Sequence, residues 1–215
     1  LPPSPLSPAA SWHNAVPLPQ GVFRYAHAQC PGEPNRFYII SGIVGGYTDK
    51  TWRYDADTDI WTALAPFPQP GEGAVAACYQ GKIYVAGGFG GMNRFFIYDI
   101  ARDAWTEGPG LPRHVWGAAL GAWDGRLYLT GGDDDIILGG APNALNIYDI
   151  ATGTWTNGVA MPTATLLPGW VQVNEFLYVV GGFGDTTGAN ITATQRYNMA
   201  TGYWETGPTF TSARA

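Results

Sequence analysis

Short runs of β-branched and aromatic residues, separated by turns rich in glycine and aspartate, recur along the whole chain. In the clearest copy, a run over 83–85 ends in a Gly-Gly pair, which is typical of a strand with a defined stop. After a glycine-rich loop, a second run over 95–98 is closed by an aspartate-containing turn, and Trp105 opens a third run. No helical periodicity is apparent, so the pattern predicts short strands joined by tight turns.

The same pattern occurs four times, which indicates a repeat protein. Four tyrosines begin the copies at intervals of 46, 44 and 50 residues, and each is followed four residues later by a glycine. A second tyrosine in each copy precedes a tryptophan by seven residues, and four identical spacings are hard to obtain by chance. These rings are large enough to fill the space between packed sheets. The first set is Tyr38 with Gly42, Tyr84 with Gly88, Tyr128 with Gly132 and Tyr178 with Gly182; the second set is Tyr54 with Trp61, Tyr98 with Trp105, Tyr148 with Trp155 and Tyr197 with Trp204.

The chain resembles the kelch repeat family. The resemblance rests on Gly-Lys-Ile-Tyr-Val-Ala-Gly-Gly at 81–88, the Tyr-Asp pair that begins at Tyr98, and Trp105, with matching sets in the other copies. It covers about residues 10–215 and implies an all-β fold, a β-propeller in which each repeat is a four-stranded blade. Two departures, Ser41 in place of a glycine and Asn198 in place of an aspartate, are both compatible with turns.

The repeats divide the chain into expected units. Residues 1–10 are rich in proline and serine and are expected to form an extended linker, and residues 11–215 to form the propeller. Residues 11–19 look like the tryptophan-containing last strand of a repeat whose earlier strands are absent. Kelch propellers commonly close through such a strand, as the resemblance implies. The four repeats are expected at about 21–67, 68–111, 112–161 and 162–208, with the start of a further repeat at 209–215.

Four repeats and one extra strand do not fill the ring of six or seven blades that the resemblance implies. An open ring would expose the faces of its end blades, which is an association hazard. We therefore expect that this propeller is part of a larger ring, completed by a longer chain, by a protein partner or by self-association. A closed four-bladed ring is the alternative, but it would leave the N-terminal strand without a blade.

Charge and composition narrow the partners. The formal net charge is -6 and only two lysines occur, which argues against nucleic acid because phosphate binding needs clustered basic residues. No apolar run is long enough for a membrane span within these residues. The non-Met start, the Pro/Ser linker and the scarcity of lysine favour an extracellular or cell-surface location. Asn190 begins a glycosylation sequon that would matter in a secreting eukaryote.

The two cysteines, Cys30 and Cys78, each fall near the end of the first strand of their repeat. Equivalent positions on neighbouring inner strands are usually farther apart than the Cα separation of roughly 4.4–6.8 Å that a disulfide needs. Two buried free thiols are therefore the favoured interpretation, and a disulfide is the alternative. The two cysteines therefore do not decide whether the protein works in an oxidising or a reducing compartment.

Few residues suggest chemistry. Asp133, Asp134 and Asp135 lie in a long loop and could supply oxygen ligands to Ca²⁺, but a solvated acidic loop is the favoured interpretation. The three histidines are dispersed, and no nucleophile, phosphate or zinc motif is present. We predict no catalytic residues, no metal site and no other cofactor.

Tryptophans are the remaining hint of a binding function. Trp116, Trp123 and Trp170 lie in or near first strands, which line the channel of a propeller, and Trp116 and Trp170 are the chosen candidates. Exposed rings there could stack on sugars or peptide side chains, although core packing is the favoured interpretation. A binding surface would be expected on loops at one end of the channel, at 44–50, 89–94, 133–143 and 183–191.

Three functions follow, and the fold alone does not decide among them. The first is a non-catalytic interaction or scaffold domain of a larger, exported protein. The second is a carbohydrate-binding module that uses loop and channel aromatics. The third is an enzyme similar to the copper oxidases or sugar epimerases of the kelch fold, although no such catalytic constellation maps onto these residues. The interaction domain is our leading hypothesis.

Overall fold

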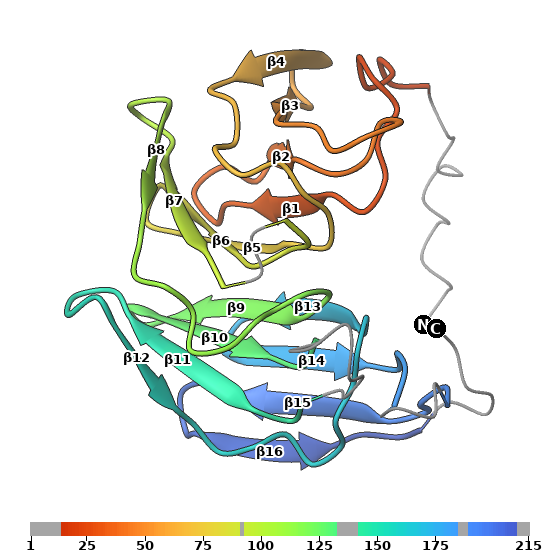
Figure 1. Ribbon diagram of the computed structural model, residues 1–215, viewed down its shortest axis with the longest axis vertical. Helices are drawn as coiled ribbons and strands as arrows, with labels where there is room; N and C mark the ends of the chain where they lie inside the picture. Colours follow the sequence, from red (N-terminus) through yellow and green to blue (C-terminus); the bar gives the residue numbers. More distant parts are fainter. Residues whose placement is uncertain (1–13, 91–92, 133–141, 185–188, 210–215) are drawn as a thin grey trace, which may run out of the picture.

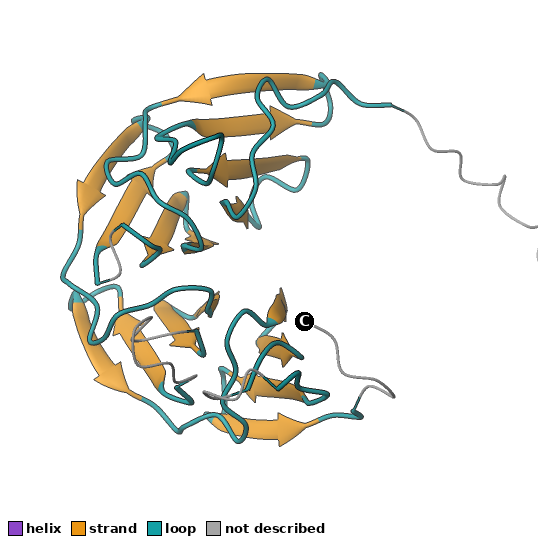
Figure 2. Cartoon of the chain, turned by 45° about the vertical axis from the view of Figure 1, so that its right-hand side comes forward, coloured by secondary structure: helices purple, strands orange, loops and turns teal. Residues whose placement is uncertain are grey.

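Four four-stranded antiparallel sheets make up the chain. The computed structural model describes residues 14–90, 93–132, 142–184 and 189–209, and within these ranges every regular element is a strand. Figure 2 shows the sheets arranged as the blades of an open arc, with a gap between the first and the last. The prediction of an all-β propeller with four four-stranded blades is thereby confirmed.

The strands follow one another from the inside of the arc to the outside in every blade (Figure 1). Consecutive strands pair as antiparallel hairpins, which is the simplest way to join short strands with tight turns. Blade 1 holds β1 (Ala26–Gln29), β2 (Arg36–Ile40), β3 (Thr51–Asp55) and β4 (Ile60–Leu64); blade 2 holds β5 (Val75–Tyr79), β6 (Lys82–Ala86), β7 (Phe95–Asp99) and β8 (Ala104–Glu107); blade 3 holds β9 (Ala119–Trp123), β10 (Arg126–Thr130), β11 (Leu145–Asp149) and β12 (Thr154–Asn157); blade 4 holds β13 (Gly169–Val173), β14 (Phe176–Val180), β15 (Thr194–Asn198) and β16 (Tyr203–Thr206).

Hydrophobic cores lie between the blades. We call the face that a blade turns to the preceding blade its leading face, and the other its trailing face. Tyr38, on the trailing face of blade 1, packs with Ile83 and Val85 on the leading face of blade 2. Equivalent clusters form between blades 2 and 3 and between blades 3 and 4. Because successive side chains of a strand point to opposite faces, blades 2 and 3 each contribute to two cores, and the end blades 1 and 4 to one each.

The departures from the kelch pattern keep its backbone. Ser41 has a φ of 58°, close to the 67° of Gly87 at the same place in blade 2. Its hydroxyl lies 2.9 and 2.8 Å from the carbonyl oxygens of Thr48 and Gly71, either of which can accept its proton, and it accepts the N–H of Gly71 at 2.9 Å. Asn198 Oδ1 accepts backbone N–H groups two and three residues later, as an aspartate does in blades 1 and 3. Both residues satisfy the turn by local hydrogen bonding.

A polar latch joins the outer strands of blades 1 and 2. Asp103 accepts the backbone N–H of Ala65 at 2.8 Å, and the indole N–H of Trp105 donates to the carbonyl oxygen of Ala65 at 3.0 Å. Asp103 also accepts the hydroxyl of Tyr98, whose ring lies 4.8 Å from that of Trp105. We call the regularly spaced tyrosines and tryptophans of the repeats marker residues. The marker pair of Tyr98 and Trp105, together with Asp103, thus fixes the end of the preceding blade.

The same latch on blade 1 holds the N-terminal segment. Asp59 accepts the N–H of Val16 at 2.9 Å, and Trp61 donates to the carbonyl oxygen of Val16 at 3.1 Å. Val16 therefore takes the place that Ala65 takes on blade 2. The interpretation of residues 11–19 as the last strand of a preceding repeat stays a prediction, because residues up to 13, and the linker, lie outside the described ranges.

Our first prediction concerns a close approach between blades 2 and 3. Gly87 has a φ of +67°, and a Cβ there would lie 2.2 Å from the carbonyl oxygen of Val115; Gly81 has a φ of +74° but open space around it. Gly81→Ala should lower the free energy of unfolding by about 1–2 kcal/mol, because alanine is strained in this left-handed backbone conformation. Gly87→Ala should lower the free energy of unfolding clearly more, because the backbone of Val115 must also move. Urea unfolding of both variants measures the difference, and equal losses would contradict the assigned contact.

Candidate functional site

The inner strands of all four blades surround a channel with two cavities. The larger, of about 900 Å³, is lined at the ends of the inner strands by Ala76, Ala122 and Asp124 among others. The smaller, of about 190 Å³, lies where the chain enters these strands and is lined in part by Trp116. A volume of several hundred Å³ is the size of a ligand pocket. The channel is therefore the candidate site.

An aromatic pair separates the two cavities. His27 of β1 and Trp170 of β13 line both cavities, and their rings stack with centroids 5.9 Å apart and planes 23° from parallel. The two residues hold the same register position in blades 1 and 4. The His27 ring is exposed to the channel, but the surrounding walls desolvate it and lower its pKa from the ordinary value of 6.5.

The two tryptophans chosen as binding candidates, Trp116 and Trp170, both line the smaller cavity. The indole of Trp116 packs against Gly73 and lies under the guanidinium of Arg24 at 5.7 Å. Its N–H finds no hydrogen-bond partner among the residues that the structure describes. Trp123 lines the larger cavity instead. These contacts place the tryptophans at the channel, while a ligand for them stays a prediction.

The remaining chemical candidates contribute little to this site. Asp133, Asp134 and Asp135, proposed for Ca²⁺, lie outside the described residues. Asn190 is described and exposed. In the described ranges, no three His, Cys, Asp or Glu side chains come together as they would around a metal ion. The same ranges contain no helix suited to crossing a membrane.

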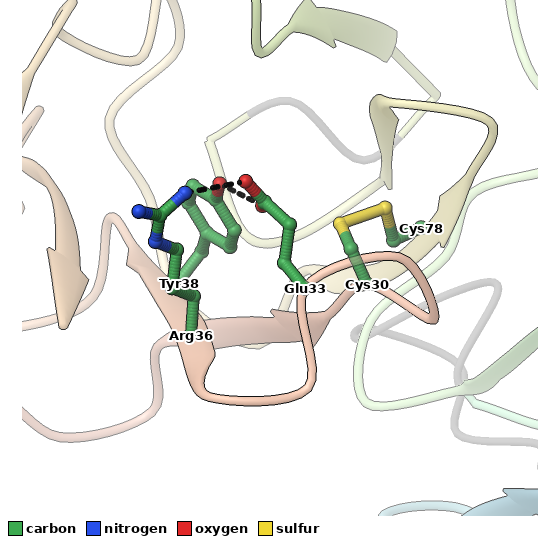
Figure 3. The surroundings of a disulfide bond; sticks show 5 residues. All are labelled: Cys30, Glu33, Arg36, Tyr38 and Cys78. Carbon is green, nitrogen blue, oxygen red and sulfur yellow. Dashed lines mark hydrogen bonds and ion pairs between the residues drawn. A yellow bond between two sulfur atoms is a disulfide. The ribbon is translucent and has the colours of Figure 1, made fainter. Parts of the chain in front are cut away.

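The expectation of two free thiols is wrong. Cys30 and Cys78 form a disulfide with a Cα separation of 5.1 Å (Figure 3). The register shows why. Cys78 is equivalent to Gln29, the last residue of β1, and Cys30 directly follows Gln29. This offset of one residue puts Cys30 on the trailing face of blade 1 and Cys78 on the leading face of blade 2, where the two side chains face each other.

The loop that carries Cys30 is held by a polar cluster, also shown in Figure 3. Glu33 accepts the hydroxyl of Tyr38 at 2.6 Å and pairs with Arg36 at 3.0 Å. Burial, and secondarily the bond to Glu33, raises the pKa of Tyr38 far above its usual range. Arg36 also binds Asp55 at 2.7 Å, and this hydrogen bond lowers the pKa of that carboxyl. The disulfide therefore joins two firmly placed strands.

One channel residue has no counterpart among the predicted candidates. Gln172 of β13 accepts the N–H of Ala122 and donates to the carbonyl oxygen of Ala122, both at 2.8 Å. A lone glutamine in a strand carries no recognisable motif, and its partner is 50 residues away. Only the placement of blade 4 against blade 3 brings them together.

Comparisons with known proteins agree with this geometry. A family model described as the kelch motif matches residues 70–112, which contain the whole of blade 2. The chain is a β-propeller that carries the kelch motif in its second blade. A solved structure entitled "Structure of YjhT" matches with a TM-score of 0.75 and 20% identity, over 93% of this chain and 68% of that one; this likeness concerns the fold. No curated protein matches the sequence.

This propeller has two open end faces. On the leading face of blade 1, Phe37 is 37% exposed, whereas its equivalents Ile83, Leu127 and Leu177 are fully buried. On the trailing face of blade 4, Val171 is 52% exposed, whereas Ala77 at the same place in blade 2 is 8% exposed. The open faces are apolar because they are the two halves of a blade junction, and within the described residues neither half is covered by another blade.

The second prediction concerns the disulfide, which closes a loop with a sequence separation of 48. Chain entropy gives a stabilisation of about 4 kcal/mol for a loop of this length. The double variant Cys30→Ser and Cys78→Ser should lose about this much of its unfolding free energy, measured in urea. Thiol titration of the unreduced wild-type protein, unfolded in denaturant, should find no free thiol. Finding two free thiols would contradict the disulfide.

The third prediction follows from His27. Because its pKa in the folded state lies below 6.5, the unfolded chain binds the proton more readily, so stability is complete above pH 6.5 and falls as the pH drops towards the folded-state value. His27→Phe keeps a ring against Trp170 but cannot titrate. Its unfolding free energy should fall less steeply below about pH 6.5. Equal slopes in urea titrations at several pH values would rule out this role.

Proposed function

We propose that this kelch propeller is a non-catalytic interaction or scaffold domain of an exported protein, and that further protein covers its two open end faces. The observation that carries the proposal is the exposure of two apolar faces whose equivalents are buried at every junction within the chain. Contiguous exposed apolar surface is typical of protein interaction sites. The kelch propeller fold is consistent with such a domain.

Kelch-type blades fit these faces best. The trailing face of blade 4 presents the marker Tyr178, whose counterparts Tyr38, Tyr84 and Tyr128 all pack on a following blade. The latch on blade 1 already holds Val16 as it would hold the end of a preceding blade. Both ends thus offer half of the junction that the chain forms three times internally.

The size of the similar structure supports two covering blades. Since 93% of this chain corresponds to 68% of that one, the other chain has about 90 residues beyond the matched part, close to two repeats. Those blades could come from a longer polypeptide or from a partner chain. In either case, the end faces would be buried in the native assembly.

An oxidising location is part of the proposal. The Cys30–Cys78 disulfide supports export, because disulfides persist in extracellular and comparable compartments and are rare in the cytosol. The exposed position of Asn190 leaves its sequon accessible, which a glycosylated extracellular protein requires.

The fourth prediction tests whether the end faces are covered. Hydroxyl-radical footprinting of the native assembly should find Phe37 and Tyr178 as protected as Tyr84, which is 3% exposed inside a junction. Tyr203, 70% exposed on outer strand β16, should react freely and serves as the internal control. Mass measurement of the same sample shows whether the cover belongs to one polypeptide or to a partner.

Strong labelling of Phe37 and Tyr178 in a stable 23 kDa monomer would overturn the proposal that the end faces are covered. It would leave an arc whose apolar ends face water.

A further inference from the structure

The channel wall consists of unpaired strand edges. In each blade the inner strand, β1, β5, β9 or β13, pairs with one neighbour only, so its other edge faces the channel (Figures 1 and 2). An edge strand presents backbone N–H and C=O groups without partners, and these groups can pair with another chain. The larger cavity lies along these edges.

The edge of β9 already binds an amide group of this chain. The carboxamide of Gln172 occupies both backbone groups of Ala122, the N–H and the C=O, as an added strand would. The side-chain amide of Gln172 therefore stands in for a peptide group at the edge of β9. The wall recognises an amide through one donor and one acceptor.

The edge of β5 offers the same arrangement without a side chain to fill it. Cys78 pairs with Ile83 in the register in which Ala122 pairs with Leu127, so Cys78 and, two residues earlier, Ala76 turn their backbone groups towards the channel. Within the described part of the chain, no other element donates to or accepts from these groups.

The cavity around this edge is suited to an uncharged chain. Alanines at 28, 76, 77 and 122 line it, and such small side chains leave room for a backbone to approach. Among the described residues that line it there is no lysine or arginine, and Asp124 is the one carboxylate. The stacked pair of His27 and Trp170 divides it from the smaller cavity, so its entrance lies at the turns that contain Pro31, Asp124 and Asn174.

We propose that this cavity binds an extended, uncharged peptide segment of a protein partner, which adds as a strand to the free edge of β5. Strand addition of this kind takes its affinity from main-chain hydrogen bonds. The five residues of β5 set the length of the segment at about five residues, or roughly 17 Å. The inference rests on the interaction function proposed above, and its cavity shares only the edge residue Val171 with the trailing face of blade 4 described above.

The test uses a blocked, uncharged peptide, acetyl-Ser-Val-Ser-Val-Ser-amide, and calorimetry with the complete protein in its native assembly. The control peptide has the same side chains but is N-methylated at alternate amides, which removes the donors of one edge. The unmodified peptide should bind, and the methylated one should bind at least about tenfold more weakly, a difference of 1.4 kcal/mol.

Two variants locate the site. Val171→Trp places a large ring at a residue that lines the cavity, and Val173→Trp places it on the same strand and face but outside the cavity lining. Both valines lie on the trailing face of blade 4 and are about half exposed in this chain, at 52% and 49%, so the two substitutions affect a covering blade alike and differ in the cavity lining. Val171→Trp should weaken peptide binding at least about tenfold, and Val173→Trp should leave it within about twofold.

Equal binding of both peptides, equal effects of the two variants, or no binding at millimolar peptide would overturn the proposal. Binding of N-acetylated sugars but not of the peptide would also overturn it, in favour of a glycan site. Footprinting of Phe37 and Tyr178 reports separately on the end faces, so either proposal can fail while the other stands.

Discussion

The packing of one blade on the next is the interaction on which the rest of this structure depends. A four-stranded sheet of short strands cannot bury either face by itself, so each blade is stable only with neighbours on both sides. The exposure of the first marker tyrosine in each blade shows this dependence. Tyr38, Tyr84 and Tyr128 are at most 3% exposed because a following blade covers them, whereas Tyr178 in the same position is only partly buried. The open ends follow directly from this requirement.

The junctions share a hydrophobic core but differ in what fixes them near the channel. At one register position of the inner strand, Cys78 binds blade 1 through a disulfide, Ala122 packs in an apolar core against blade 2, and Gln172 binds the backbone of blade 3. Gln29 holds this position in blade 1, where it donates to its own turn at Pro34 instead. The position is thus a general point of contact between blades, and each junction meets it with different chemistry.

The sequence allowed the fold to be predicted because repetition is visible along one dimension. Regular spacing of tyrosine, glycine and tryptophan is sufficient to place strands, turns and blades. The latch also had a signal, since Asp59 and Asp103 each precede the marker tryptophan by two residues, whereas blades 3 and 4 have glycine there. The disulfide depended on a register offset of a single residue, which decides the face on which a side chain lies. The contact of His27 with Trp170 carries no sequence signal, because it depends on how far the arc curves.

Ring completion and the channel edges are separate problems for this fold. Added blades would cover faces, since blades meet face to face, but each would also bring another inner strand with its own free edge. Completing the ring therefore buries the apolar ends and leaves the channel wall lined with unpaired backbone groups. Water satisfies such groups in an open channel, but the Gln172 carboxamide shows that a protein amide can replace water there. A propeller of this kind keeps its capacity for backbone recognition at its axis, however its ends are covered.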